Sequence, residues 1–194
     1  MIDLDHGLAA PEPLLERAWQ QPVAQLYSRA GLITQRMRAM CGPTSLALAL
    51  RSAGIAAEPE RVLDDTPVAT LFGMRMGGMS LDQVAEVLRI KSGYEVQILR
   101  NLSLAEFREQ LSLVNDPRHR FIANFDRQPL FGWGGGHHSP LGAYLPDAGA
   151  VLVVDTNGKV GPWMVSVPRL HHATFKREPW MDKPRGLARL TLGD

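Results

Sequence analysis

The chain has 194 residues, of which 45% are hydrophobic and 21% are charged. A chain of this length can bury one sizeable core without disulfides or metal ions, and its composition excludes a disordered chain, a coiled coil and a collagen-like fibre. Its 21 Lys and Arg residues nearly balance 20 Asp and Glu residues, and no basic stripe predicts a nucleic-acid partner. No run of 18 apolar residues predicts a membrane span.

The first half of the chain carries mostly helical patterns. Apolar residues recur at threes and fours over residues 12–30, where Pro22 must bend or break the segment. Residues 43–53 predict a buried helix with proline in its first turn and glycine directly after it. Ser80 and Ser103 each precede a helical pattern and have Gln or Glu three residues later, which is a capping box.

Short apolar segments that predict β-strands dominate the second half. They are residues 95–99, 121–125, 139–145, 150–155, 165–167 and 187–192. Residues 146–149, Pro-Asp-Ala-Gly, join two of them in a hairpin turn. Helices followed by an antiparallel sheet predict an α+β fold, and we expect a single domain over residues 1–194.

Cys41 is the chain's one cysteine, which rules out an internal disulfide and any zinc site that needs two thiolates of this chain. It directly precedes Gly42, Pro43 and the apolar helix. A thiol at a helix N-terminus is favoured as the thiolate, which is its reactive form. Two alternatives stay open on these local grounds: a nucleophile, or a small buried hydrophobic residue.

A thiolate nucleophile needs a base and a group that orients the base. Among six histidines, His137 and His138 stand out because they follow a glycine-rich stretch, where a substrate can approach closely, and begin a predicted strand. The hairpin brings Asp155 back to the same open end as His137, and Asn157 is a possible substitute. Each of these residues also has an ordinary structural reading: packing, solvation, a strand end or a turn.

Acyl transfer also needs hydrogen-bond donors for the oxyanion. The backbone N–H of Cys41 is one such donor. Gln35, six residues upstream, is a candidate side-chain donor, although a solvated loop residue is the simpler interpretation.

Three sequence blocks resemble the phytochelatin synthase family, a papain-like group of γ-glutamylcysteine transferases. They are Gln35–Leu50, with the pattern Q-x5-C-G before a helix, Gly77–Ala85, and Gly136–Tyr144, which is similar to G-H-F-S-P-(I/L)-G-G-Y. The resemblance covers roughly residues 25–170 and is closest to short prokaryotic members. It implies a single papain-like catalytic domain, an α+β fold with the nucleophile at a helix N-terminus packed on an antiparallel sheet.

The resemblance also implies roles for individual residues. Cys41 becomes the acylated nucleophile, and His137 becomes the base because His138 falls where the family has an aromatic residue. Asp155 would orient His137, and Gln35 would help to form the oxyanion hole.

The reaction that the resemblance implies is attack on the Cys–Gly bond of glutathione. Glycine leaves, and a γ-glutamylcysteinyl thioester passes to a second glutathione, which makes a phytochelatin, or to water. We expect no tightly bound cofactor, and a divalent metal such as Cd or Zn would enter as a thiolate complex of the substrate. A homodimer is one alternative for the oligomeric state. The compartment stays open between the cytoplasm and, after loss of a leader absent from this sequence, the periplasm.

One departure from the family bears on substrate binding. Plant members have an arginine three residues after the acid, where this chain has Gly158; the adjacent Lys159 supplies charge but no bidentate fork. The departure bears most on the binding of a second substrate. Hydrolysis dominates in several of the short prokaryotic members that this chain resembles, so the resemblance implies a hydrolase with weaker transferase ability. Two alternatives remain: the same triad acting on a different peptide, amide or γ-glutamyl substrate, and a non-catalytic binding protein on this fold.

Overall fold

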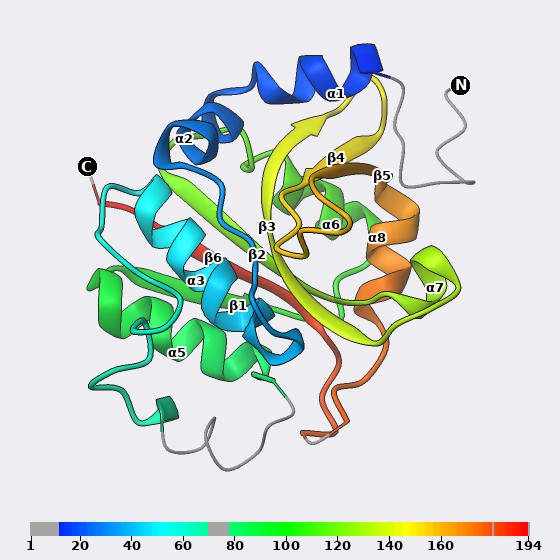
Figure 1. Ribbon diagram of the computed structural model, residues 1–194. Coiled ribbons are helices and arrows are strands. Elements are labelled where there is room, and N and C mark those ends of the chain that lie inside the picture. Colours follow the sequence, from blue (N-terminus) through cyan, green and yellow to red (C-terminus); the bar gives the residue numbers. More distant parts are fainter. Residues whose placement is uncertain (1–11, 70–77, 180, 194) are drawn as a thin grey trace.

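The computed structural model describes residues 12–69, 78–179 and 181–193. Its centre is a six-stranded sheet in which every neighbouring pair is antiparallel, in the order β1-β6-β2-β3-β4-β5 (Figure 1). The strands are β1 (Glu95–Leu99), β2 (His119–Asp126), β3 (Gly136–Leu145), β4 (Ala150–Val153), β5 (Trp163–Ser166) and β6 (Gly186–Thr191). The predicted α+β class is confirmed.

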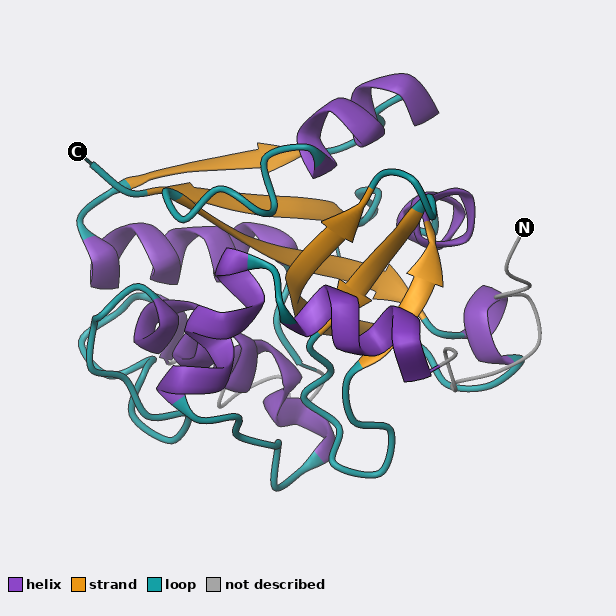
Figure 2. Ribbon diagram, turned by 90° about the horizontal axis from the view of Figure 1, so that it is seen from above, coloured by secondary structure: helices purple, strands orange, loops and turns teal. Residues whose placement is uncertain are grey.

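Helices cover both faces of this sheet (Figure 2). One face carries α1 (Glu12–Trp19), α2 (Pro22–Ala30), α3 (Cys41–Ser52) and α5 (Leu81–Ser92), and the other carries α6 (Leu104–Leu111), α7 (Gln128–Phe131) and α8 (Val167–Thr174). Each side has its own apolar core, because alternate residues of a strand point to opposite faces. In β2, for example, Phe125 packs under α6 and α8 while Ile122 packs under α3 and α5.

Helix α3 is the element that carries the single cysteine. All but one of its 12 residues are buried, between β3 on one side and α2 and α5 on the others. A short 3-10 turn, η1 (Arg38–Met40), leads into it. The helix therefore begins at Cys41, two residues earlier than the sequence pattern predicts, so the cysteine is part of the first turn.

Several local predictions are confirmed. Pro22 does break the first helical segment, since α1 ends at Trp19 and α2 begins at the proline. Ser80 and Ser103 both form complete capping boxes. The glycine at position 77 of the second family-like block lies outside the described residues.

The predicted strand at 165–167 is wrong at its end. The strand covers Trp163–Ser166, and Val167 begins α8, where proline in the first turn favours a helix. His171 and His172 lie on this helix. In the described part of the chain, no helix is long and apolar enough to cross a membrane.

Candidate active site

Cys41 lies at the first residue of α3 and lines a cavity of about 390 Å³. Only 6% of the residue is exposed. The next residue must be small, because a Cβ on Gly42 would press into the side chain of Met79, another residue of the cavity wall. The helix N-terminus and this packing place a shielded sulfur at the edge of an open space.

The two adjacent histidines of β3 lie on opposite faces of the sheet. His138 pairs with Asn124 and His137 with Phe125 across the β2–β3 ladder. His138 faces α3: its carbonyl accepts a hydrogen bond of 2.9 Å from Ser45 Oγ, and its Nδ1 lies 4.0 Å from Cys41 Sγ. His138 also lines the cavity.

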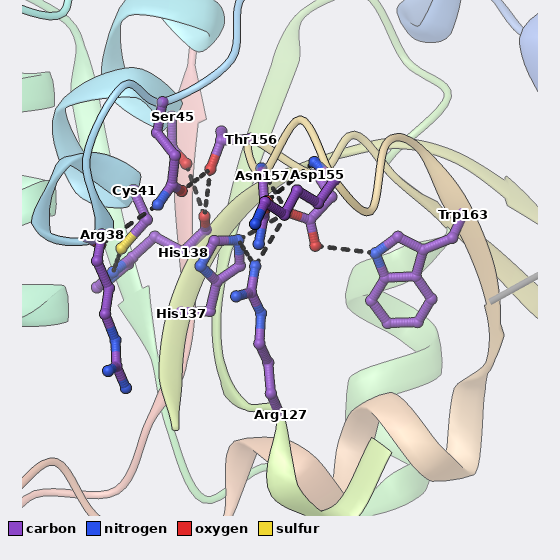
Figure 3. A network of polar contacts seen from close by, with 12 residues as sticks. Arg38, Cys41, Ser45, Arg127, His137, His138, Asp155, Thr156, Asn157 and Trp163 are labelled. Atoms are coloured by element: carbon purple, nitrogen blue, oxygen red, sulfur yellow. Dashed lines mark hydrogen bonds and ion pairs between the residues drawn. The ribbon is translucent and has the colours of Figure 1, made fainter. Parts of the chain in front are cut away.

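His137 contacts the predicted acid directly. The distance from its Nε2 to Oδ1 of Asp155 is 2.8 Å, and its ring packs edge-on against Phe125. Asp155 follows β4 and is held in turn by Trp163 Nε1, which donates to Oδ2 at 3.0 Å, and by the backbone N–H of Asn157 at 2.8 Å. Figure 3 shows His137 between Cys41 and Asp155.

The charges of these three groups are coupled. Burial alone raises the pKa of the Cys41 thiol, but hydrogen bonding to His137 and His138 and their charge lower that pKa well below its usual value. Burial lowers the pKa of His137, yet contacts with Asp155 and Cys41 raise it overall. The pKa of Asp155 is lowered, because contact with His137 outweighs burial. The arrangement favours a thiolate beside an imidazolium.

Arg127 is a fourth member of this cluster that the sequence did not reveal. Its Nη2 lies 3.2 Å from Asp155 Oδ1 and 2.7 Å from His137 Nε2 (Figure 3). Its charge helps to hold Asp155 ionised. Arg127 lies ten residues before His137, between β2 and α7, and a single arginine in such a position carries no distinctive pattern.

Gln35 connects the turn before α3 to the segment that follows β4. Its backbone N–H donates to the Thr156 carbonyl at 2.7 Å, and its side-chain oxygen accepts from Thr156 Oγ1 at 2.9 Å. Its amide nitrogen donates to the carbonyls of Met37 and Arg38 at 3.1 and 3.3 Å. Gln35 therefore lies near Cys41 in the fold, while its oxyanion role stays a prediction.

Asn157 and Lys159, the two other candidates from the sequence, do not contact the Cys41–His137–Asp155 group through their side chains. Asn157 accepts from the backbone N–H of Lys159 at 3.0 Å, as a turn residue does, and it is Asp155 that contacts His137. Lys159 is exposed and is not part of the cavity wall that the structure describes.

The cavity wall beyond Cys41 carries a buried cation and a buried anion that the sequence analysis missed. Arg185 and Glu178 are only 5% and 4% exposed. Asn124 connects them: its side-chain oxygen accepts from Arg185 Nη1 at 2.7 Å, and its nitrogen donates to Glu178 Oε1. A Cβ on Gly136 would overlap the Arg185 guanidinium, so the glycine before the histidines makes room for this cation.

These wall residues have no recognisable spacing in the sequence. They come from β2 and from the connection between α8 and β6, and only the sheet order brings them together. In the described residues, no group of three or more His, Cys, Asp or Glu side chains could hold a metal ion.

A cysteine at a helix N-terminus, facing a His–Asp pair from an antiparallel sheet, defines a papain-like cysteine peptidase fold. A family model described as phytochelatin synthase matches residues 7–187. The chain therefore belongs to the phytochelatin synthase family, and its activity class is that of a cysteine-dependent transpeptidase or peptidase. No curated protein matches the sequence significantly.

Solved structures with this fold are papain-like peptidases. The peptidase domain of Streptococcus ComA, a bifunctional ABC transporter involved in quorum sensing, has a TM-score of 0.56 and 16% identity, over 84% of this chain and 98% of that one. A C39-like peptidase from Bacillus anthracis has a TM-score of 0.60 and 13% identity, over 86% and 96%. A double-glycine-motif protease from an AMS/PCAT transporter, solved with its leader peptide, has a TM-score of 0.54 and 15% identity, over 84% and 91%.

Proposed function

We propose that the protein cleaves glutathione at its Cys–Gly bond through a γ-glutamylcysteinyl thioester on Cys41. Water is the main acceptor of the acyl group, and a second glutathione is the minor one. Family membership supports the chemistry, and the charged wall of the cavity supports the substrate class.

The observation that carries the proposal is the Arg185–Glu178 pair. The γ-glutamyl group of glutathione ends in an α-carboxylate and an α-ammonium group, which match a guanidinium and a carboxylate on one wall. One polar atom of each side chain is free to bind a ligand. Arg185 Nε and Glu178 Oε2 are buried, and each lacks a hydrogen-bond partner within the described residues. The nearest cation to Glu178 Oε2 is Arg100, with Nη2 at 3.6 Å. Buried charges are stabilised by further hydrogen bonds and opposite charges, so a zwitterionic ligand that reaches Arg185 Nε and Glu178 Oε2 adds to the contacts with Asn124 and Arg100.

The proposed mechanism follows from the arrangement of Cys41, His137 and Asp155, with His137 between the other two. Cys41 Sγ attacks the carbonyl carbon of the Cys–Gly bond after its proton has passed to His137, whose Nε2 is held by Asp155. The backbone N–H at the start of α3 donates to the oxyanion, and Gln35 joins it if its amide leaves the Met37 carbonyl. The C–N bond breaks, His137 returns its proton to the amine of glycine, and the thioester remains.

The second half-reaction reverses these proton transfers. His137 takes a proton from water or from the amino group of a second glutathione, which then attacks the thioester and frees the Cys41 sulfur. Lys159, adjacent to the Gly158 departure, offers no bidentate contact for a second glutathione, and this favours hydrolysis. Cd or Zn would act as a glutathione thiolate complex, which is part of the substrate.

Mass spectrometry of the intact protein after incubation with glutathione tests this proposal. We expect Cys41 to gain the mass of one γ-glutamylcysteinyl group and free glycine to appear in solution. Cys41→Ser is the control and forms neither product. The same enzyme sample is offered a peptide with a Gly-Gly cleavage site, because the similar AMS/PCAT protease is a double-glycine-motif protease. Cleavage of that peptide with no glutathione adduct would overturn the proposal in favour of a peptidase.

A further inference from the structure

The sulfur of Cys41 has two imidazole neighbours, and the reaction described above uses only one of them. We propose that His138 is a second hydrogen-bond donor to Cys41 Sγ, which keeps the sulfur anionic while His137 exchanges its proton with the substrate. This inference rests on Cys41 as the nucleophile of the proposed function, but not on glutathione as the substrate.

The ring nitrogens of His138 have unequal surroundings. Nδ1 lies 4.0 Å from Cys41 Sγ, at the outer limit of an N–H···S hydrogen bond. Nε2 is buried and has no hydrogen-bond partner within the described residues. A proton on Nε2 would be a buried, unsatisfied donor, whereas a lone pair there costs less. The neutral tautomer that this environment favours therefore has its proton on Nδ1, pointing at the sulfur.

The backbone of His138 is fixed against α3. Its carbonyl accepts hydrogen bonds from Ser45 Oγ at 2.9 Å and from Thr156 Oγ1 at 3.5 Å, and only 2% of the residue is exposed. Ser45 belongs to the same helix as Cys41, so the donor and the sulfur are held by one rigid unit. Figure 3 shows this contact, with the sulfur and the His138 ring facing each other.

The two histidines have different roles because only His137 is hydrogen-bonded to a carboxylate. His137 is bonded to Asp155, which makes it the stronger base and the proton carrier. His138 contacts no carboxylate within hydrogen-bond distance in the described residues, so nothing orients it as a proton carrier, and its role is to donate to the sulfur. Besides the two imidazoles, the charge of Arg185 acts on Cys41 from the cavity wall, and Arg127 and Asp155 lie behind His137.

The experiment measures the rate of alkylation by iodoacetamide as a function of pH. Cys41 is the chain's only cysteine, so the rate reports its thiolate fraction directly and needs no glutathione. His138→Phe restores the aromatic residue of the family resemblance and removes both ring nitrogens. His138→Asn places an amide N–H near the position of Nδ1, and His138→Gln places it near the position of Nε2.

We expect the midpoint of the alkylation profile to move up by about half to one pH unit in His138→Phe and His138→Gln, which is about threefold to tenfold slower alkylation on the acidic limb. His138→Asn keeps most of the wild-type midpoint. Circular dichroism and thermal unfolding identify the folded variants. A folded Phe or Gln variant with the wild-type midpoint, or an Asn variant shifted as far as Phe, would overturn the role of His138. Neither result depends on whether glutathione is cleaved, so this test and the adduct experiment fail separately.

Discussion

His137 and His138 are neighbours on β3, and both interact with the sulfur of Cys41. We expect them to contribute differently to the rate, because their other hydrogen-bond partners differ. His137 is backed by Asp155 at 2.8 Å, whereas His138 offers a single N–H to the sulfur. Removal of a general base typically costs about 10²-fold to 10⁴-fold in rate, because no other group carries the proton. We expect His137→Ala to lose turnover in this range and His138→Ala to lose about tenfold or less. Steady-state cleavage of glutathione measures both.

The comparison of these two variants has a built-in control. Both substitutions remove an equally buried imidazole from the same strand, and thermal unfolding identifies the variants that remain folded. Equal losses of turnover in two folded variants would show that His137 has been assigned the wrong role.

We expect Asp155 to set the upper pH limit of activity. The pKa of Cys41 is lowered, so the thiolate exists above that pKa and is lost as the pH falls through it. The pKa of His137 is raised by Asp155, so the imidazolium persists below that pKa and is lost as the pH rises through it. Activity therefore has a plateau between the two values. Asp155→Asn removes the anion, and we expect the alkaline limb of kcat/KM to move to lower pH.

Substitutions of Asp155 distinguish the effect of its negative charge from its effect on the orientation of the His137 ring. Asparagine can still accept the Nε2 proton of His137, whereas alanine cannot. We expect Asp155→Asn to retain a measurable residual rate and Asp155→Ala to lose more. Trp163→Phe removes the donor to Oδ2 but keeps an aromatic ring beside Phe125 and Phe131, and it is the control with the smallest loss. An alanine variant as active as the asparagine variant would remove Asp155 from the catalytic group.

At the scale of single residues, the sequence could predict those with a local pattern. Cys41 stands before an apolar helix, and His137 and Asp155 flank a hairpin, so their proximity follows from chain geometry alone. Arg127 and Arg185 could not be predicted, because a lone arginine near a turn is normally a surface residue. Only burial beside named partners identifies them.

Among the elements, the start of β3 couples the histidines to the cavity wall. A Cβ at Gly136 overlaps the guanidinium of Arg185, and the side chain has to move away. We expect Gly136→Ala to raise KM for glutathione about tenfold or more with a smaller change in kcat, since a binding contact worth about 1.5–3 kcal/mol to a charged group is lost. Initial-rate kinetics give both constants.

Gly135→Ala is the matched control for this substitution. Its added Cβ meets nothing within 4 Å, so both constants should stay close to wild type. A rise in KM of the same size in both variants would mean that loop stiffening, rather than displacement of Arg185, is responsible.

Element predictions succeeded where a local signal dominates. Capping boxes at Ser80 and Ser103 fixed the starts of α5 and α6, because a helix N-terminus satisfies its free N–H groups locally. The boundary at Val167 was missed because its apolar run suits a strand as well as a helix, and packing under β2 and β5 decided between them. The order of the six strands needs tertiary contacts and was not predicted.

In the whole molecule, the reacting group and the binding wall come from separate parts of the fold. Cys41 belongs to a helix layer on one face, while Asp155 and Trp163 lie toward the other face, and β3 passes the two histidines between them. Glu178, from the connection between α8 and β6, accepts from the backbone N–H of Leu81 at 2.7 Å and so joins the wall to the start of α5. A ligand that neutralises this wall therefore connects β2, α5 and the α8–β6 connection on the same face of the sheet as Cys41.

Because the charged wall connects several elements, we expect bound glutathione to raise the free energy of unfolding of the whole fold. A ligand at a hundredfold excess over its Kd adds about 2.7 kcal/mol to the free energy of unfolding, and each kcal/mol raises the Tm of a chain of this size by about 2–4 °C. We expect this shift in Cys41→Ala, which binds glutathione without turnover, as measured by thermal unfolding. Cysteinylglycine, which lacks the γ-glutamyl group, should leave the Tm unchanged, and Arg185→Met in the same background should remove the glutathione shift. Equal shifts from both ligands would mean that the wall does not recognise the γ-glutamyl group.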